Sequence, residues 1–464
     1  MPIDKIDELI ENSREELKQT IIKLVKIKST MGDSLPGAPF GEGPKEMLDT
    51  VLNMGEAEGF YAEDYNVGVV SLALKEGQPD LGIWLHSDVV PEGGGWTFEP
   101  YNPVEYKGCI IGRGAADNKG QLAAIFTLFK IFKKLSVGLN YNAAIYVGSN
   151  EESGMADMKG LPGNPDAKGF ANVCTPPKLS LVPDSDWPIG YGARGMATFF
   201  LRSKNQLRSL SLTAGLDEEP GIAMAVLDTD EFPDTLSGCS VEKGSKVVVT
   251  AYSTPHHTSK PDPEGNMITK LTTALLKENL VCESDRNILE FFRDISLDLH
   301  ADMFGLNVKT EAMPPTIVYA KTIETVDGCP QLEIRLRYPI ELTYDEIVEK
   351  LSAVCAEREF EVISGFRRHN PYLRASDTPL VKTLAEVAHS VVGCTSEPFI
   401  SGSTYAHYLP NAYVYGMNAN RPPAEFEEGR GGAHSVDEAV SVDRLILAMK
   451  VYARAMLALN DFLK

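Results

Sequence analysis

The pattern of the predicted strands changes along the chain, and this change limits the folds that the chain can adopt. Near the N-terminus, apolar runs of strand length lie at 67–74, 81–86, 142–150 and 178–184. Helical segments separate them, among them the long apolar stretch after Asp117. Strands that are buried on both faces read as continuous apolar runs, and their alternation with helices predicts an open α/β sheet.

From about Arg194 the strands change character and look half-exposed, as in PQLEIRLRYP and KVVVTAY. Helical stretches lie between and after them, near 266–280, 285–299 and 343–357. Strands with helices on one face predict a smaller α+β domain. After about Arg368 the α/β pattern returns, with a helix near 377–391, a strand at 411–416 and a long final helix.

A chain of 464 residues is too long for one hydrophobic core. We therefore expect one domain built from both ends of the chain, residues 1–193 and 369–464, with a second domain, 194–368, inserted between them. At the N-terminus, apolar spacing from Ile6 to Val25 predicts a helix. Ser435 and Glu438 form an S-x-x-E pattern that predicts the start of the final helix.

Charge and cysteine content narrow the function classes. The formal net charge is −21, which disfavours binding to nucleic acid and to anionic membranes. No apolar run approaches the ~18 residues of a membrane span, and the N-terminus lacks a secretory signal pattern. The seven cysteines never form a CxxC pair. We therefore expect reduced thiols in the cytoplasm and any metal to be held by histidine and carboxylate.

Five motifs carry acids or histidines where strands end or helices begin. They are His86-Ser87-Asp88, the Gly-rich run 112–120 around Asp117, Glu151-Glu152, Asp184 and His434. Each alone has an ordinary structural explanation, such as a polar strand end, a helix N-cap or a solvated loop. Together, however, they lie where α/β sheets place ligands.

The set His86, Asp117, Glu152, Asp184 and His434 would supply three protein ligands to each of two metals if Asp117 bridges them. Glu151 then remains as a general base.

The order of these motifs resembles the zinc-dependent aminoacylase/carboxypeptidase/dipeptidase family, especially bacterial dipeptidases for Xaa-His and β-Ala-Xaa substrates. The matching stretches are LHSDVVPEGGGW (85–96), IGRGAADNKGQ (111–121), SNEESG (149–154), LVPDSDWPIGYGARG (181–195), SGSTYAHYLPNAYVYG (401–416) and GGAHSVDE (431–438). The resemblance implies a zinc-exopeptidase-like catalytic domain with an open mixed sheet and an inserted α+β lid domain.

The resemblance also implies residue roles. His86 and Asp184 would hold one zinc, Glu152 and His434 the other, and Asp117 would bridge both. Mn²⁺ or Co²⁺ would be possible substitutes for the two Zn²⁺ ions. The peptide bond after Asp117 would be cis.

Other residues would support the metals and the substrate. Asp88 would orient His86, and Glu151 would be the base. In the lid, His257 would reach the oxyanion on closure, with His256 as a near competitor, and Arg337 would grip substrate, although Arg335 is close. Gly402, Ser403 and Thr404 would bind the substrate carboxylate.

The sequence departs from the family pattern at three places. Asn118 stands where a second aspartate is common, and His407 stands where an arginine is frequent. The segment AGLDEEPGIA (214–223) carries Asp217, Glu218 and Glu219 instead of the usual lid asparagine. These departures put substrate preference in question.

The leading hypothesis is therefore a dipeptidase in which zinc activates water and Glu151 moves its proton. One alternative is a deacylase or desuccinylase of N-acyl amino acids with the same fold. A second alternative is a non-catalytic zinc or peptide binding protein. We expect a small peptide substrate, no nucleic-acid or membrane partner, and a monomer or homodimer.

Overall fold

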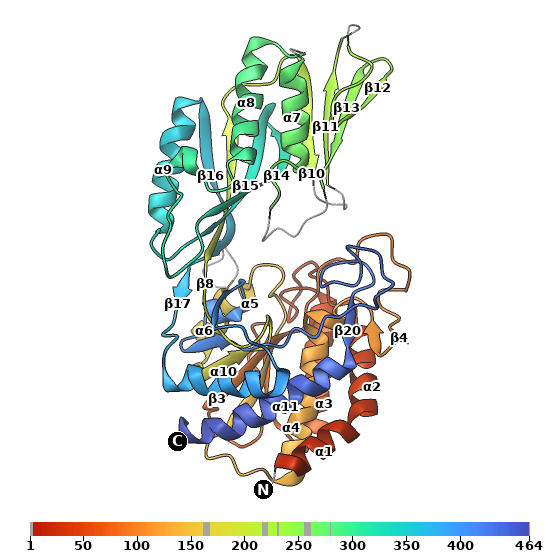
Figure 1. Ribbon diagram of the computed structural model, residues 1–464, viewed down its shortest axis with the longest axis vertical. Helices are drawn as coiled ribbons and strands as arrows, with labels where there is room; N and C mark the ends of the chain where they lie inside the picture. The colour runs from red at the N-terminus through yellow and green to blue at the C-terminus, as the bar shows by residue number, and fades with distance from the viewer. Residues whose placement is uncertain are drawn as a thin grey trace. The chain divides into compact units, whose positions relative to one another are not determined.

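The computed structural model describes residues 3–160, 168–215, 221–229, 232–254, 261–278 and 280–463. The chain divides into two compact units, shown in Figure 1. The first comprises Met1–Ala193 and Leu373–Lys464, and the second comprises Arg194–Tyr372. Among the described residues, no helix is long and apolar enough to cross a membrane.

The first unit contains a large mixed sheet. Across it lie β1 (Tyr61–Asp64), β2 (Val69–Ala73), β6 (Ala143–Gly148), β3 (Leu81–His86), β7 (Leu179–Val182), β19 (Ala412–Val414), β8 (Gly190–Ala193) and β17 (Tyr372–Leu373), with β18 (Phe399–Ser401) beside β8. The four neighbours β6, β3, β7 and β19 are mutually parallel. Their carboxyl ends therefore lie at one edge of the sheet. β3 and β6 are buried along their whole length, as their continuous apolar sequences predict.

The helices of this unit are α1 (Ile3–Asn12), α2 (Arg14–Val25), α3 (Glu42–Ala57), α4 (Gly120–Leu135), α5 (Ala156–Lys159), α6 (Phe170–Val173), α10 (Pro379–Val392) and α11 (Val442–Ala458). α4 packs against α1, α2 and α11, and α10 lies beside α11 (Figure 1). α1, α2, α3, α4, α10 and α11 share one apolar core with the sheet. The prediction of a single N-terminal helix is wrong, because the chain breaks at Ser13, whose hydroxyl donates to the Ile10 carbonyl at 2.7 Å.

A second, three-stranded sheet in this unit joins distant segments. It consists of β4 (Val104–Tyr106), β5 (Cys109–Ile111) and β20 (Ala439–Ser441). The predicted start of the final helix near Ser435 is wrong, because β20 comes first and α11 begins at Val442. Its N-cap is Ser441, whose side chain accepts a hydrogen bond from the Arg444 amide. Glu438 is therefore free of a capping role.

The second unit is a two-layer α+β structure. Its antiparallel sheet has the order β12 (Ser240–Lys243), β13 (Val247–Tyr252), β11 (Ile222–Leu227), β10 (Leu210–Gly215), β14 (Ile317–Val326), β15 (Cys329–Tyr338), β9 (Gly195–Ser203) and β16 (Phe360–His369). Its helices are α7 (Met267–Lys277), α8 (Glu283–Leu297) and α9 (Tyr344–Glu357). Burial alternates along β10 and β13, so one face of the sheet meets the helices in an apolar core. The predicted fold class, an α/β sheet domain with a smaller α+β domain, is confirmed.

Candidate metal centre

The carboxyl edge of the parallel strands gathers several of the predicted site residues. His86 is the last residue of β3, which lies between β6 and β7. Glu151 and Glu152 follow the end of β6, and Asp184 follows the end of β7. Because these three strands are parallel neighbours, their ends deliver the four side chains to one place.

Asp117 joins two clusters of possible ligand atoms. Its Oδ1 lies 2.9 Å from His86 Nε2, and its Oδ2 lies 3.1 Å from His434 Nε2. His86, Asp117 and Asp184 form one cluster, and Asp117, Glu152 and His434 form the other. Within each cluster the ligand atoms all lie within 4.8 Å of one another. The two oxygens of one carboxylate thus face two different histidines.

The donor set suits a divalent cation. Each cluster combines one histidine nitrogen with carboxylate oxygens of two acids. Imidazole and carboxylate are the nitrogen and oxygen ligands that zinc takes in catalytic sites. His86 Nδ1 lies 3.0 Å from the Asp88 carbonyl oxygen. When Nδ1 carries the ring proton and donates it to this oxygen, Nε2 is left to bind a metal.

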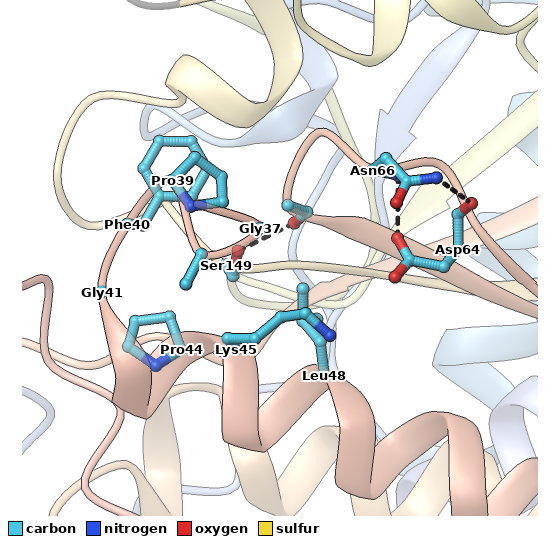
Figure 2. Close-up of a pocket in the computed structure, with 12 residues that line it drawn as sticks. Gly37, Pro39, Phe40, Gly41, Pro44, Lys45, Leu48, Asp64, Asn66 and Ser149 are labelled. Carbon is cyan, nitrogen blue, oxygen red and sulfur yellow. Dashed lines mark hydrogen bonds between the residues drawn. The ribbon is translucent and has the colours of Figure 1, made fainter. Parts of the chain in front are cut away.

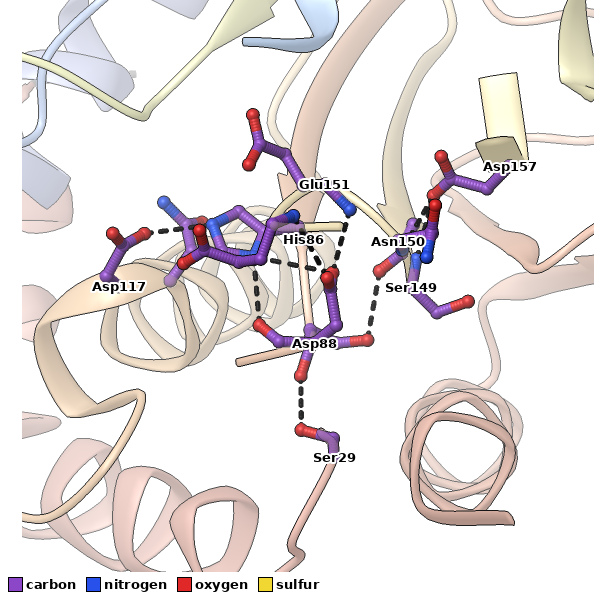
Figure 3. Close-up of polar contacts among 12 residues, drawn as sticks. Ser29, His86, Asp88, Asp117, Ser149, Asn150, Glu151 and Asp157 are labelled. Atoms are coloured by element: carbon purple, nitrogen blue, oxygen red, sulfur yellow. Dashed lines mark hydrogen bonds and ion pairs between the residues drawn. The ribbon is translucent and has the colours of Figure 1, made fainter. Parts of the chain in front are cut away.

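Asp88 lies near His86, and its side chain binds the loop after β6. Its side chain is 1% exposed, and its two oxygens accept hydrogen bonds from the amides of Glu151 and Glu152, each at 3.0 Å. Its Oδ1 also lies 3.6 Å from His86 Nδ1. Figure 3 shows this carboxylate between the histidine and the loop of the acid pair. Asp88 therefore ties the end of β3 to the loop after β6.

The crowded charges shift the pKa values of the acids in different directions. Burial raises the pKa of Glu151 well above its ordinary value, helped by the negative charges of Asp184 and Glu152 against the opposing charge of His86. Burial likewise raises the pKa of Asp184 to about 7, together with the charge of Asp117. Burial would also raise the pKa of Asp117, but hydrogen bonds from His434 and His86 outweigh it and lower that pKa. The site is thus rich in carboxylates that a cation would neutralise.

The loop before α4 presents Asp117 in an irregular conformation. Asp117 has φ −147° and ψ 90°, and its peptide bond to Asn118 is cis, as the resemblance implied. The alternative that Asp117 is only an N-cap is wrong, because α4 begins at Gly120 after Lys119. Asn118 donates to Asp184 Oδ1 at 3.3 Å, so this departure from the family pattern supports a neighbouring acid.

The predicted lid residues belong to the second unit. Arg337 lies in β15, where burial lowers its pKa. Its competitor Arg335 donates to Glu333 Oε1 at 3.2 Å and is thus already paired. His256, His257, Asp217, Glu218 and Glu219 lie outside the described residues.

The predicted carboxylate-binding segment lies in the first unit. Gly402 is exposed, and the Ser403 hydroxyl is buried without a hydrogen-bond partner among the described residues. Thr404 caps the 3₁₀ turn η3 (Tyr405–His407) by accepting from the Ala406 amide at 3.3 Å. The hydroxyl of Ser403 is therefore the group in this segment that still lacks a partner.

Sequence reasoning missed a buried link between this segment and the acid pair. The Tyr405 hydroxyl donates to Asp157 Oδ2 at 2.5 Å, and the same oxygen accepts from the amides of Ser149 and Asn150. Figure 3 shows Asp157 beside Ser149 and Asn150, the two residues that precede Glu151 in the chain. The aspartate carries no local motif, and 248 residues separate it from Tyr405.

A pocket outside the metal centre has a different character. It has a volume of about 70 Å³ and is lined by Phe40, Pro44, Lys45, Asn66 and Ser149 among others (Figure 2). None of the clustered acids or histidines lines it. The candidate metal ligands therefore lie outside this pocket.

Comparison with known proteins decides the family. The sequence pattern of "Peptidase family M20/M25/M40" matches residues 83–458. The chain belongs to this family. It is therefore a hydrolase of the metallopeptidase class, and the resemblance seen in the motifs is confirmed.

Relatives of this M20 peptidase extend over nearly its whole length. It is 26% identical to the "Putative dipeptidase YtjP" of Bacillus subtilis (strain 168), over 98% of this chain and 97% of that protein. It is 27% identical to a "Putative dipeptidase" of Staphylococcus epidermidis, over 94% and 95%.

Solved structures show the same fold at low identity. Human carnosine dipeptidase 1 matches with a TM-score of 0.60 and 15% identity, over 99% of both chains. The aminoacylhistidine dipeptidase of Vibrio alginolyticus matches with a TM-score of 0.53 and 12% identity, over 95% of this chain and 96% of its own.

Proposed function

We propose that this M20 peptidase is a two-zinc dipeptidase. The observation that carries the proposal is the position of Asp117, whose two oxygens face His86 in one ligand cluster and His434 in the other. His86 and Asp184 would hold one ion, Glu152 and His434 the other, and Asp117 would bridge them. When bound, two such ions lower the pKa of water and polarise the scissile carbonyl.

Glu151 is the proposed general base. It lies at the same strand edge as the clusters but belongs to neither. Its Oε1 is buried and has no hydrogen-bond partner among the described residues, so no other contact occupies this oxygen. Glu151 would take a proton from the attacking water and deliver it to the leaving amine, and Asp88 would hold the backbone of the acid pair in place.

Dipeptides are the proposed substrates. The two relatives above carry the name "Putative dipeptidase", and both align with nearly the whole chain. Arg337 and the segment Gly402–Thr404 are the proposed carboxylate-binding groups, since arginine grips carboxylates in two places at once. His257 is the proposed oxyanion group. All seven cysteines are free, which fits our proposal of a cytoplasmic enzyme.

Paired substitutions in the acid pair test the mechanism. Glu151→Gln keeps the shape of the side chain and should retain the metal content while kcat falls by about 10²–10⁴-fold. Glu152→Gln removes a proposed ligand and should lower the metal content as well. Metal analysis and kinetics on the same preparations decide it. A fully active Glu151→Gln enzyme would exclude Glu151 as the base.

Substrate analogues test whether the enzyme recognises the free C-terminal carboxylate of its substrate. A dipeptide, its C-terminal amide and the matching tripeptide are compared with zinc, manganese and cobalt supplied separately. The amide and the tripeptide should each lose at least about tenfold in kcat/KM, or about 1.4 kcal/mol. Equal rates on all three would remove the carboxylate clamp, and preference for N-acetyl or N-succinyl amino acids would instead identify a deacylase.

A further inference from the structure

The three-stranded sheet places a buried acid next to the loop that presents Asp117. β20 pairs with β5 so that Ala439 lies opposite Ile111. The next residues in each direction then meet, and the Gly112 amide donates to the Glu438 carbonyl at 2.9 Å. Glu438 is 0% exposed, and its side chain lies against the loop that follows β5.

Both oxygens of the Glu438 carboxylate are fully used by this loop. Oε1 accepts from the amides of Ala116 at 2.8 Å and Asp117 at 3.0 Å. Oε2 accepts from the Gly114 amide at 3.0 Å and from Arg113 Nη1 at 2.7 Å. Four donors thus converge on one carboxylate, and one of them is the backbone amide of the proposed bridging ligand itself.

Arg113 extends the same contact toward the second histidine. Its guanidinium is 2% exposed, pairs with Glu438, and donates more weakly to the His434 carbonyl at 3.4 Å. The neighbouring acid Asp437 makes different contacts from Glu438. Its side chain accepts hydrogen bonds from the amides of Thr97 and Phe98 rather than from this loop.

We propose that Glu438 is a positioning residue of the metal centre, and that it fixes the separation of the two ligand clusters by holding the backbone of Asp117. The inference rests on the proposed two-metal function. Its alternative, a helix-capping role, does not apply because α11 is capped by Ser441. The hydrogen bonds of the Glu438 carboxylate go to backbone amides and to Arg113, not to a ligand side chain. It acts through the backbone from which the Asp117 side chain projects, and through Arg113 on the loop of His434.

Glu438→Gln is the test, because it changes one carboxyl oxygen into an NH₂ group without changing the shape. Wherever that NH₂ lies, it faces N–H donors, so two of the four hydrogen bonds are lost and donors meet donors. The matched control is Glu425→Gln, an exposed acid that accepts from the Tyr106 hydroxyl at 2.9 Å.

There are three readouts. The visible absorption spectrum of the Co²⁺-loaded protein reports the coordination geometry. The Co²⁺ affinity and the separate values of kcat and KM are the other two. We expect Glu438→Gln to change the spectrum, to weaken Co²⁺ binding about 10–100-fold, and to lower kcat more than it raises KM. Glu425→Gln should match the wild type in all of these.

Three results would overturn the inference. A Glu438→Gln protein that melts earlier but keeps the wild-type spectrum and Co²⁺ affinity would show a purely structural role for Glu438. A wild-type protein that binds no Co²⁺ would instead refute the proposed metal centre, and the inference with it. If Glu438→Gln does not fold, Arg113→Lys is measured in the same way, and an unchanged spectrum there overturns the inference.

Discussion

Replacing the buried Asp157 should raise the free energy of unfolding at high pH rather than lower it. Its Oδ2 accepts all three hydrogen bonds, from the Tyr405 hydroxyl at 2.5 Å and from the amides of Ser149 at 2.9 Å and Asn150 at 3.1 Å. Its Oδ1 is buried and has no partner among the described residues. In Asp157→Asn, the carbonyl oxygen can take the place of Oδ2 and keep all three bonds, while the buried charge disappears.

The magnitude follows from the pKa. Burial raises the pKa of Asp157 from 3.8 to about 7, with the charge of Asp88 acting in the same direction and the Tyr405 hydrogen bond against it. Between these values the folded state binds more protons than the unfolded state, so the free energy of unfolding falls as pH rises. This penalty is absent below pH ~4 and complete above pH ~7, where it amounts to about 4 kcal/mol.

The substituted amide has a cost of its own. Its NH₂ group occupies the place of Oδ1, and an unpaired buried donor costs about 1–3 kcal/mol at any pH. Asp157→Asn should therefore be about as stable as the wild type at pH 5 and more stable by about 1–3 kcal/mol at pH 8. The stability difference between Asp157→Asn and the wild type should change by about 2–3 kcal/mol from pH 5 to pH 8. This change does not depend on the cost of the unpaired amide.

Urea unfolding of the metal-free proteins at pH 5 to 8 measures this difference without a contribution from metal affinity. Asp443→Asn is the control for the same substitution at an exposed position, because the Asp443 side chain is 80% exposed. If the Asp157→Asn difference were independent of pH, or if the variant lost stability as pH rises, the assignment of a protonated buried carboxyl would be wrong.

Three further predictions concern the metal and the local structure. Removal of metal with a chelator should abolish activity and lower the free energy of unfolding by about 2.7 kcal/mol relative to protein at 100 times the dissociation constant, measured by activity and unfolding before and after zinc is restored. Asp88→Asn should weaken metal binding about 10–100-fold, because its amide cannot accept from both amides of the acid pair; unchanged zinc affinity would contradict this. Ser441→Ala should cost about 0.5–2 kcal/mol as the loss of the α11 cap, whereas Ser435→Ala should cost less than half of that in the same unfolding assay.

The sequence carries much of this arrangement because parallel strands end at a common edge. His86, Glu151 and Asp184 each follow an apolar run, so their convergence is predictable from the order of strands without knowing any distance. Their roles as ligands and base stay predictions. The apolar run of α4 similarly reveals the helix after Asp117.

What the sequence could not show depends on pairing between distant segments. β20 has three residues, too few for a readable strand pattern, and it pairs with β5 more than three hundred positions earlier. Without that pairing, Glu438 three residues after Ser435 matches a helix cap, and the local pattern gives the wrong element. Asp157 and Tyr405 pose the same difficulty, because neither lies in a motif that names its partner.

The position of β19 has a consequence for how the protein is made. This strand lies between β7 and β8, although it is synthesised more than two hundred residues after them. At about 5–20 residues per second, a ribosome needs some ten seconds or more to reach it. During that time the edges of β7 and β8 lack their shared neighbour, while the residues of the second unit are being synthesised. A nascent chain of this protein therefore depends on keeping those two edges from pairing with other chains until the end of translation.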